Sequence, residues 1–317
     1  MRAGILTRLG LFAVLLAVAC SDSAEPGSNA ITLRRISATE ANSSVTNFVP
    51  DHFIWLDPAR APSKLVVFLP GTQGVPEAYT LVGELVAQQG YRVIGLMYPN
   101  DLGAIFGCAT DADPDCMEKL RHEITYGGDV SPHVAVDATN SIANRLADLL
   151  MLLSREYPNE EWDAFLDGSI PRWTSIVVSG QSQGGGQAAY IAKTRTVHRV
   201  VMFGAPADGV GGQPGTWMQI GLTDVSRYFG FRHVQDHFPS ISPNWIALGL
   251  DRFGAARTVD GNSSSFAGSH MLLTDVLPST GSYSDAHSSV VTDGSTPLRA
   301  GGGPAFAAIW RYLFGTP

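Results

Sequence analysis

The sequence predicts an α/β fold in which a mostly parallel, twisted β-sheet carries helices on both faces. Three observations predict it. Short apolar runs typical of buried strands recur along the chain. Between several of them lie segments whose apolar residues recur at helical spacing. The strands read as continuous rather than alternating apolar runs, which indicates a parallel sheet covered on both faces.

The expected elements follow one another from residue 53 onward. Strands are expected at 53–56, 64–69 (KLVVFL), 91–98, 175–178, 200–203, 227–235 and 271–277. Helices are expected after Pro76, through 142–153, from about Gly184, and within 304–313. Gly90 stands where the first of these helices would take a C-terminal glycine cap.

The composition indicates one large folded domain. The chain has 317 residues, of which 44% are apolar and 16% charged, so it can bury a sizeable core. No internal repeat or second linker divides residues 31–317, which we expect to form a single domain without a large cap domain. The net charge of −8 is spread along the chain. Because nucleic-acid binding needs a basic face, we expect no nucleic-acid partner.

The first 19 residues have the pattern of a signal peptide. Their apolar stretch, 9–19 (LGLFAVLLAVA), is too short to remain as a membrane-spanning helix. The following Cys20 completes a segment, LAVAC, that resembles the bacterial lipobox, in which the cysteine is lipidated. Residues 17–19 (AVA) also suit ordinary cleavage. We therefore expect an exported lipoprotein held on a membrane (periplasmic or at the cell surface) by Cys20 and a tether through 20–30, or else a secreted protein.

The segment SGQSQGGG, residues 179–186, directly follows an apolar strand. A residue on a very tight turn from strand to helix is forced into a strained backbone conformation. Side chains two positions away on either side would collide unless they are tiny. Gly180 and Gly184 occupy those two positions around Ser182. The spacing therefore predicts that Ser182 lies on such a turn.

Gly180–Gln181–Ser182–Gln183–Gly184, with a strand before it and a small-residue helix after it, resembles the G-x-S-x-G nucleophile elbow of the α/β-hydrolase superfamily. The resemblance extends, by order of strands and helices, over most of residues 31–317. It implies a serine hydrolase that cleaves carboxylic esters through an acyl-enzyme, with Ser182 as nucleophile. It also implies that the catalytic acid and then the base follow along the chain.

The resemblance places the acid after a later strand. Asp236 stands at the tip of the strand expected over 227–235, and we expect it to be the acid. Asp208, which follows the strand at 200–203, is the alternative. A serine hydroxyl is a poor nucleophile until an imidazole accepts its proton, and the carboxylate holds that imidazole in the productive tautomer.

Two histidines flank the last strand expected, 271–277. In the superfamily the base lies on the loop between the final strand and the C-terminal helix, which favours His287. If the final core strand were 257–259 instead, His270 would be the base.

The oxyanion donors implied by the resemblance are two backbone amides. One belongs to Gln183, directly after the nucleophile. The other belongs to the loop after the strand at 64–69, PGTQG, in which Thr72 is expected to donate. Pro70 stands where the family has histidine, which loosens the choice between Thr72 and Gln73.

Apart from Cys20, the chain has two cysteines, Cys108 and Cys116, close together in sequence. An oxidising compartment would favour a disulfide between them.

Two polar clusters could suggest a metal, but neither fits one. In the first, made of His233, Asp236 and His237, a strand would not put all three side chains on one face. In the second, made of Asp111, Asp113 and Asp115, Pro114 intrudes and the glycine and glutamate of a calcium loop are missing. Phosphate-cradling and dinucleotide motifs are also missing from the sequence. We expect neither a metal nor a cofactor.

The sequence thus predicts a serine hydrolase acting on a small-molecule or polymeric ester. The segments 101–132, expected as a loop, and 209–226, with Trp217 and Met218, are candidate walls of its acyl pocket. Two other readings use the same residues: a binding lipoprotein that kept the fold without turnover, and an acyltransferase with the same triad. Neither the acyl and alcohol groups nor the oligomeric state follow from the sequence.

Overall fold

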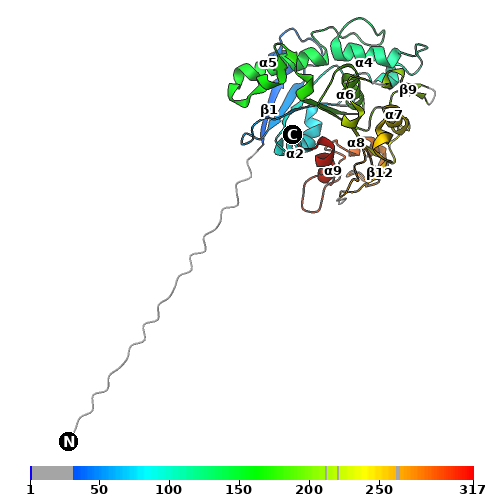
Figure 1. Ribbon diagram of the computed structural model, residues 1–317. Helices are drawn as coiled ribbons and strands as arrows, with labels where there is room; N and C mark the ends of the chain where they lie inside the picture. Colours follow the sequence, from blue (N-terminus) through cyan, green and yellow to red (C-terminus); the bar gives the residue numbers. More distant parts are fainter. Residues whose placement is uncertain (2–30, 211–212, 220, 262–264) are drawn as a thin grey trace.

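The computed structural model describes residues 1, 31–210, 213–219, 221–261 and 265–317, which form a central sheet with helices on both sides (Figure 1). The predicted α/β class is confirmed. The whole tether with Cys20, and all of the predicted signal peptide except Met1, lie outside the described residues. Among those that are described, no helix is both long enough and apolar enough to span a bilayer.

The central sheet is mostly parallel. Its strands, in spatial order, are β1 (Thr32–Ser37), β2 (Asp51–Leu56), β4 (Arg92–Gly95), β3 (Leu65–Leu69), β7 (Ile176–Gln181), β8 (Arg199–Phe203), β11 (Tyr228–His233), β13 (Met271–Thr274) and β12 (Arg257–Thr258). The pairs β1·β2 and β2·β4 are antiparallel, and all the other neighbours are parallel. The carboxyl ends of the parallel strands therefore meet at one edge.

Helices cover both faces of this sheet. The α-helices are α1 (Ala38–Ala41), α2 (Thr80–Gln88), α3 (Ala104–Gly107), α4 (Cys116–Tyr126), α5 (Ile142–Glu156), α6 (Gln183–Thr194), α7 (Ile241–Ala247), α8 (Ala286–Ser289) and α9 (Ala307–Phe314). The 3-10 helices are η1 (Pro76–Tyr79), η2 (Pro158–Glu160), η3 (Trp162–Phe165), η4 (Trp173–Ser175), η5 (Thr216–Met218), η6 (Val225–Arg227), η7 (Leu250–Phe253) and η8 (Tyr283–Asp285). Two small hairpins, β5 (Leu166–Asp167) with β6 (Ile170–Pro171) and β9 (Gly209–Val210) with β10 (Gln213–Pro214), lie outside the sheet.

The strands divide their side chains between two apolar cores. Along β3, Leu65, Val67 and Leu69 pack into the core that α4, α5, α6 and α7 cover. Val66 and Phe68 point the other way, into the core beneath α2 and α9. Because side chains alternate across a strand, a continuous apolar run serves both cores at once. Burying each of these side chains adds roughly 1.5 to 3 kcal/mol to the free energy of unfolding.

The segment 101–132, expected as a loop, contains two helices. It contains α3 and the eleven-residue α4. Met117, Leu120 and Ile124 recur at helical spacing on α4 and are buried against the core that α5 and α6 share. The expectation of a loop was wrong because these three apolar residues are scattered among charged ones, in CMEKLRHEITY. Tertiary burial of one narrow stripe is enough to form the helix.

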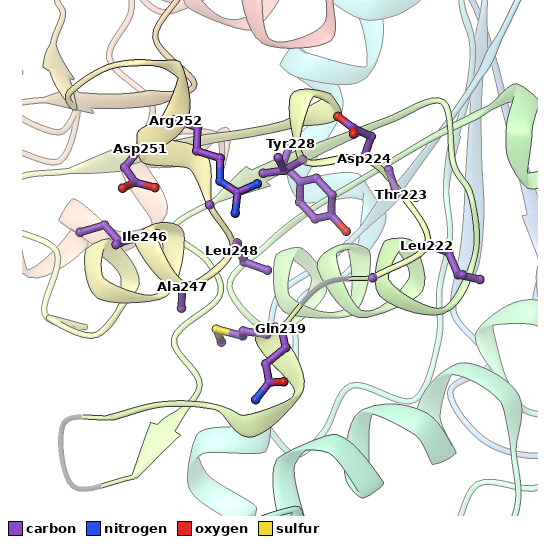
Figure 2. A pocket seen from close by; sticks show the side chains of 14 residues that line it. Gln219, Leu222, Thr223, Asp224, Tyr228, Ile246, Ala247, Leu248, Asp251 and Arg252 are labelled. Carbon is purple, nitrogen blue, oxygen red and sulfur yellow. The ribbon is translucent and has the colours of Figure 1, made fainter.

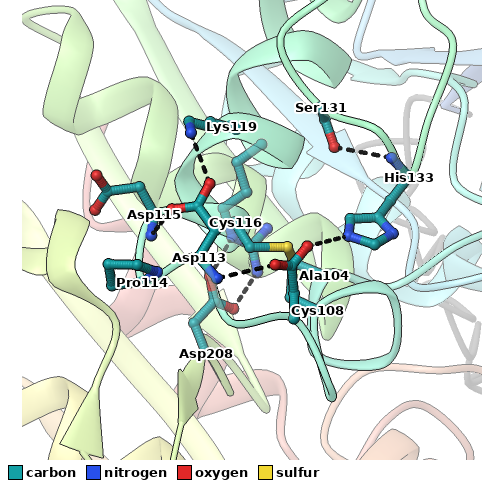
Figure 3. Close-up of a disulfide and its surroundings, with 12 residues drawn as sticks. Ala104, Cys108, Asp113, Pro114, Asp115, Cys116, Lys119, Ser131, His133 and Asp208 are labelled. Atoms are coloured by element: carbon teal, nitrogen blue, oxygen red, sulfur yellow. Dashed lines mark hydrogen bonds and ion pairs between the residues drawn. A yellow bond between two sulfur atoms is a disulfide. The ribbon is translucent and has the colours of Figure 1, made fainter.

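The expected disulfide between Cys108 and Cys116 is present (Figure 3). Cys108 directly follows α3 and Cys116 is the first residue of α4, so the bridge joins the end of one helix to the start of the next. Both half-cystines are buried in the core.

Asp293 caps α2 from a distant part of the chain. Its carboxylate accepts the amide hydrogens of Thr80 (2.9 Å) and Leu81 (3.1 Å), two of the donors that a helix N-terminus leaves without an internal partner. Burial raises the pKa of the Asp293 carboxyl from its ordinary 3.8 to about 6. Proton binding to this residue therefore favours the folded state.

We expect Asp293 to make the folding stability fall as the pH rises from 4 to 6. In that window the folded protein binds more protons at Asp293 than the unfolded chain does, so raising the pH favours unfolding. Asp293→Asn cannot titrate, and it carries a constant cost because its amide faces one of the helix amides. Its stability relative to the wild type should therefore rise between pH 4 and 6, as measured by urea unfolding at several pH values. A pH-independent difference would contradict this assignment.

Candidate active site

Ser182 forms the turn between β7 and α6. Its φ of 52° lies in the left-handed region that residues other than glycine rarely adopt. The Ser182 amide donates to the carbonyl of Phe203 (2.9 Å), and its own carbonyl accepts the Gly186 amide (3.0 Å). These bonds hold the strained turn at the carboxyl edge of the sheet. The residue is half-buried and lines a small cleft there.

The glycines around Ser182 are required by close approaches of other segments. A Cβ on Gly184 would lie 2.0 Å from the Leu69 carbonyl oxygen, and one on Gly180 would lie 2.4 Å from the Gly184 carbonyl carbon. Real Cβ atoms essentially never come within 3.0 Å of another heavy atom. The turn therefore packs against the end of β3 and leaves no room for a side chain at either glycine.

Asp236 and His287 form a hydrogen-bonded pair at the same edge. Asp236 follows β11, and its Oδ2 lies 2.9 Å from His287 Nδ1. The other oxygen, Oδ1, accepts the Phe238 amide (2.9 Å), and the Asp236 side chain is fully buried. The ring of Phe238 then contacts the His287 ring edge to face, with centroids 4.7 Å apart. These contacts fix the imidazole with its Nδ1 toward the carboxylate.

His287 lies close to the Ser182 turn. Gly204, the residue after Phe203, has a φ of +55°, and a Cβ there would lie 3.1 Å from the His287 ring. The same Phe203 carbonyl accepts the Ser182 amide. His287 Nε2 is buried and has no hydrogen-bond partner among the described residues, the Ser182 hydroxyl included. Serine–histidine bonds are often loose without substrate and tighten in the complex.

The alternative acid, Asp208, has other partners. It is fully buried and forms a two-pronged ion pair with Arg121, with one distance of 2.6 Å, and it also accepts the Trp217 indole N–H (2.8 Å). In Figure 3 Asp208 lies below the disulfide loop. Both of its oxygens are therefore engaged away from either histidine.

The alternative base, His270, lies at the opposite edge of the sheet. It immediately precedes β13, so it sits at the amino end of a strand that is parallel to β11. Its Nδ1–H donates to the Tyr228 carbonyl (2.8 Å), and its ring is stacked between Phe229 and Phe253, each 4.0 Å away. Burial lowers the pKa of His270. The structure does not bring it to Ser182.

Thr72 and Gln183 line the cleft of Ser182, which has a volume of about 20 Å³, roughly the room for one water molecule. Gln183 is the first residue of α6, so its amide has no acceptor within the helix. No described residue accepts the Thr72 amide. A Cβ on the neighbouring Gly71 would lie 3.3 Å from Ser182 Cβ, so this loop touches the turn. Because helix N-termini favour negative charge, the start of α6 favours an anion at this cleft.

Three buried side chains hold that loop, and the sequence analysis missed them. Asn100 donates to the carbonyls of Gly71 and Gly74 (both 2.8 Å). The Tyr98 hydroxyl donates to the Pro70 carbonyl (2.8 Å), and the Tyr79 hydroxyl accepts the Gly71 amide (3.2 Å). An asparagine just past the carboxyl end of an apolar strand was the available signal.

Arg121 was also missed, and it explains the third glycine of the GGG run. A Cβ on Gly186 would lie 2.1 Å from Arg121 Nη2, and one on Gly185 would lie 2.5 Å from Ala205 Cβ. Arg121 Nη1 donates to the Gln183 carbonyl (3.3 Å). The start of α6 thus packs on the loop after β3, the loop after β8 and α4 at once.

None of the described residues of 209–226, the segment predicted as a wall of the acyl pocket, lines the cleft. Ile105, Phe106 and Arg121, which belong to the other predicted wall, 101–132, line the cleft together with Ala207 and Asp208. Trp217 is buried against Asp208, and Met218 lines a separate pocket of about 490 Å³ (Figure 2). That pocket also contains Tyr228, the first residue of β11, and so reaches toward the amino edge.

Other polar clusters have partners within the protein. His133 Nε2 bonds Asp111 (2.6 Å) beside the disulfide (Figure 3), and the two neighbouring cysteines are bridged to each other. His233 accepts the Gln235 amide (2.9 Å) at Nδ1 and bonds the Val276 carbonyl (3.1 Å) at Nε2.

Asp208→Ala should lower the free energy of unfolding by about 3 to 5 kcal/mol, because it leaves the Arg121 guanidinium buried without a counter-charge. The double variant Arg121→Met/Asp208→Leu should recover much of this loss. Urea unfolding of both, with the exposed Asp224→Ala as control, measures the difference. A single variant as stable as the wild type would contradict the role given to the pair.

Comparison with known proteins gives matches among solved structures. No protein-family model matches the chain, and no curated protein does. It is similar in structure to an esterase from the hyperthermophilic archaeon Pyrobaculum calidifontis (16% identity, TM-score 0.26), over 50% of this chain and 38% of that one. It is also similar to an acetyl xylan esterase from Aspergillus awamori (16% identity, TM-score 0.32), over 52% of this chain and 51% of that one. The match thus spans about half or less of each of those proteins.

Proposed function

We propose that this protein is a serine hydrolase that cleaves carboxylic esters, with Ser182 as nucleophile, His287 as base and Asp236 as the acid that orients it. One observation carries the proposal. The strained turn at Ser182 and the Asp236–His287 pair converge on the same two residues, Phe203 and Gly204. The unpartnered Nε2 of His287 is the atom that would accept the serine proton.

The proposed reaction follows from these positions. The Ser182 oxygen attacks the acyl carbon while His287 Nε2 takes its proton, and Asp236 stabilises the resulting imidazolium. The amides of Thr72 and Gln183 stabilise the oxyanion of the tetrahedral intermediate. His287 then protonates the departing alcohol. Water, activated by the same histidine, attacks the acyl-enzyme, releases the acid and restores the serine.

Ser182→Ala and His287→Ala should each lower kcat by at least about 10⁴-fold on p-nitrophenyl acetate, since each removes a member of a unit that acts together. His270→Gln, the matched histidine control at the other edge, should leave the rate unchanged. A fluorophosphonate probe should label the wild type and not Ser182→Ala.

Two outcomes would count against this assignment. A folded wild type that neither turns over the ester nor reacts with the probe would favour a binding protein. A transfer product that dominates when alcohols or amines are added would favour an acyltransferase. Circular dichroism of each variant checks that it is still folded, so that a loss of activity can be assigned to the missing side chain.

We also propose that the protein is exported and lipidated at Cys20. Support comes from the apolar stretch 9–19 ahead of the LAVAC segment and from the Cys108–Cys116 disulfide, which is typical of oxidising compartments. In bacterial cells given radiolabelled palmitate, the wild type should incorporate label and partition with membranes. Cys20→Ala should do neither, and a labelled Cys20→Ala variant would contradict the anchor.

A further inference from the structure

A second cavity, of about 450 Å³, lies at the same edge of the sheet as Ser182. Its walls come from three segments far apart in sequence and include Asn47, Phe48, Pro99, Asp101, Pro132 and His133. Its volume falls in the range of pockets that bind small molecules, about 300 to 1,000 Å³. The cleft of Ser182, at about 20 Å³, offers far less room.

One short stretch of chain separates the cavity from the active-site cleft. Pro99 and Asp101 line the cavity, and Gly103 lines the cleft. Two residues of extended chain span at most about 7 Å, so Asp101 and Gly103, which line the two spaces, have their Cα atoms within about 7 Å of each other. The residue between Pro99 and Asp101 is Asn100, which holds the loop of Thr72 through Gly71 and Gly74. The wall between the spaces is thus fixed by a buried side chain.

Several polar side-chain groups of the cavity have no hydrogen-bond partner among the described residues, and most of them are uncharged. Among the described residues, none bonds the exposed Asp101 carboxylate or the Asn47 side-chain amide. His133 uses Nε2 for Asp111, which leaves Nδ1 for a ligand. No lysine or arginine lines the cavity, so an anionic ligand would gain nothing from it.

The apolar part of the cavity is held rigidly. Phe48 has a φ of 52°, and its carbonyl accepts a hydrogen bond from the buried Arg145 (2.8 Å). Arg145 also donates to the Asn47 carbonyl and to Asn140. The backbone that carries the half-buried Phe48 is therefore held in place, in the wall that Pro99 and Pro132 also line.

We propose that this cavity binds a pyranose ring, the carbohydrate portion of the ester that Ser182 cleaves. The inference rests on the proposed function for the identity of the bond broken. A sugar presents C–H faces that pack on an aromatic ring and on prolines, and hydroxyls that bond carboxylate, amide and imidazole groups. An alkyl chain would bury those polar groups without partners. A cation would gain little, because the cavity lining offers it one carboxylate, the exposed Asp101, beside a histidine.

The test compares esters that differ only in what the cavity would hold. Wild type, Asp101→Asn and Phe48→Leu are assayed on monoacetylated methyl glucoside, mannoside and xyloside, on p-nitrophenyl acetate and on acetylcholine. Both variants should lower kcat/KM about tenfold on at least one sugar ester, chiefly through KM, since a hydrogen bond to a charged group or a ring contact is lost. Both should leave p-nitrophenyl acetate unchanged. The matched control is Asp251→Asn, at an exposed aspartate on η7, which should change kcat/KM neither on the sugar esters nor on p-nitrophenyl acetate.

The inference would be overturned if the variants changed kcat/KM equally on all esters, or changed it on no sugar ester. A wild-type preference for acetylcholine that Asp101→Asn abolishes would also overturn it. If the wild type cleaves no ester at all, the proposed function fails, and binding then decides the inference by itself. Saturation-transfer NMR with the unacetylated methyl glycosides should show contact in the wild type and weaker contact in Asp101→Asn and Phe48→Leu. No contact, or equal contact in all three proteins, would overturn it.

Discussion

The whole candidate site depends on backbone packing at the start of α6, where the chain leaves β7 without side chains to keep its neighbours away. Gly184 touches the Leu69 carbonyl, Gly185 touches Ala205, and Gly186 touches Arg121. Those contacts belong to the loops after β3 and β8 and to α4, the segments that border the cleft. Because interiors are close-packed, a single added methyl group here would displace several walls at once. The strain at Ser182 persists because its surroundings fix it from three sides.

Buried polar contacts fix the positions of loops that strand pairing in the sheet does not determine. Asn100 and Tyr98 bond the carbonyls of the loop that carries Thr72, and each bond replaces one that water would otherwise supply. The buried Arg121–Asp208 pair lines the cleft, and the attraction between its two charges offsets much of the free energy needed to remove them from water. Such a pair adds little net stability compared with apolar residues of the same shape. Its effect is on position: Arg121 also bonds the Gln183 carbonyl, so the floor of the cleft is tied to the helix that supplies an oxyanion donor.

The sheet and the Ser182 turn could be predicted from the sequence because their signals are local. An apolar run of five or six residues predicts a buried strand, and two glycines around a serine predict the turn. Asn100, Arg121 and the inward face of α4 could not be predicted in this way, since their partners lie far away in sequence. The choice between His270 and His287 depended on which edge of the sheet each would reach. In the structure both β12 and β13 belong to the sheet, β12 as a two-residue edge strand and β13 between it and β11, so His270 precedes the final strand and His287 follows it. The order of strands in a sheet depends on which strands pair with each other, and the periodicity of apolar residues in the sequence does not reveal that pairing.

The base and the oxyanion loop are also connected through a contact that bypasses the sheet. His287 lies on α8, and the chain continues from it to Asp293, whose carboxylate caps α2 and whose amide donates to the Ala78 carbonyl (2.9 Å). Tyr79, the next residue after Ala78, bonds the amide of Gly71 beside Thr72. The segment that presents the imidazole and the loop that would hold the oxyanion therefore share one anchor around residues 78–81. A shift of that anchor would move both groups together, which preserves their mutual geometry better than independent attachment to separate strands would.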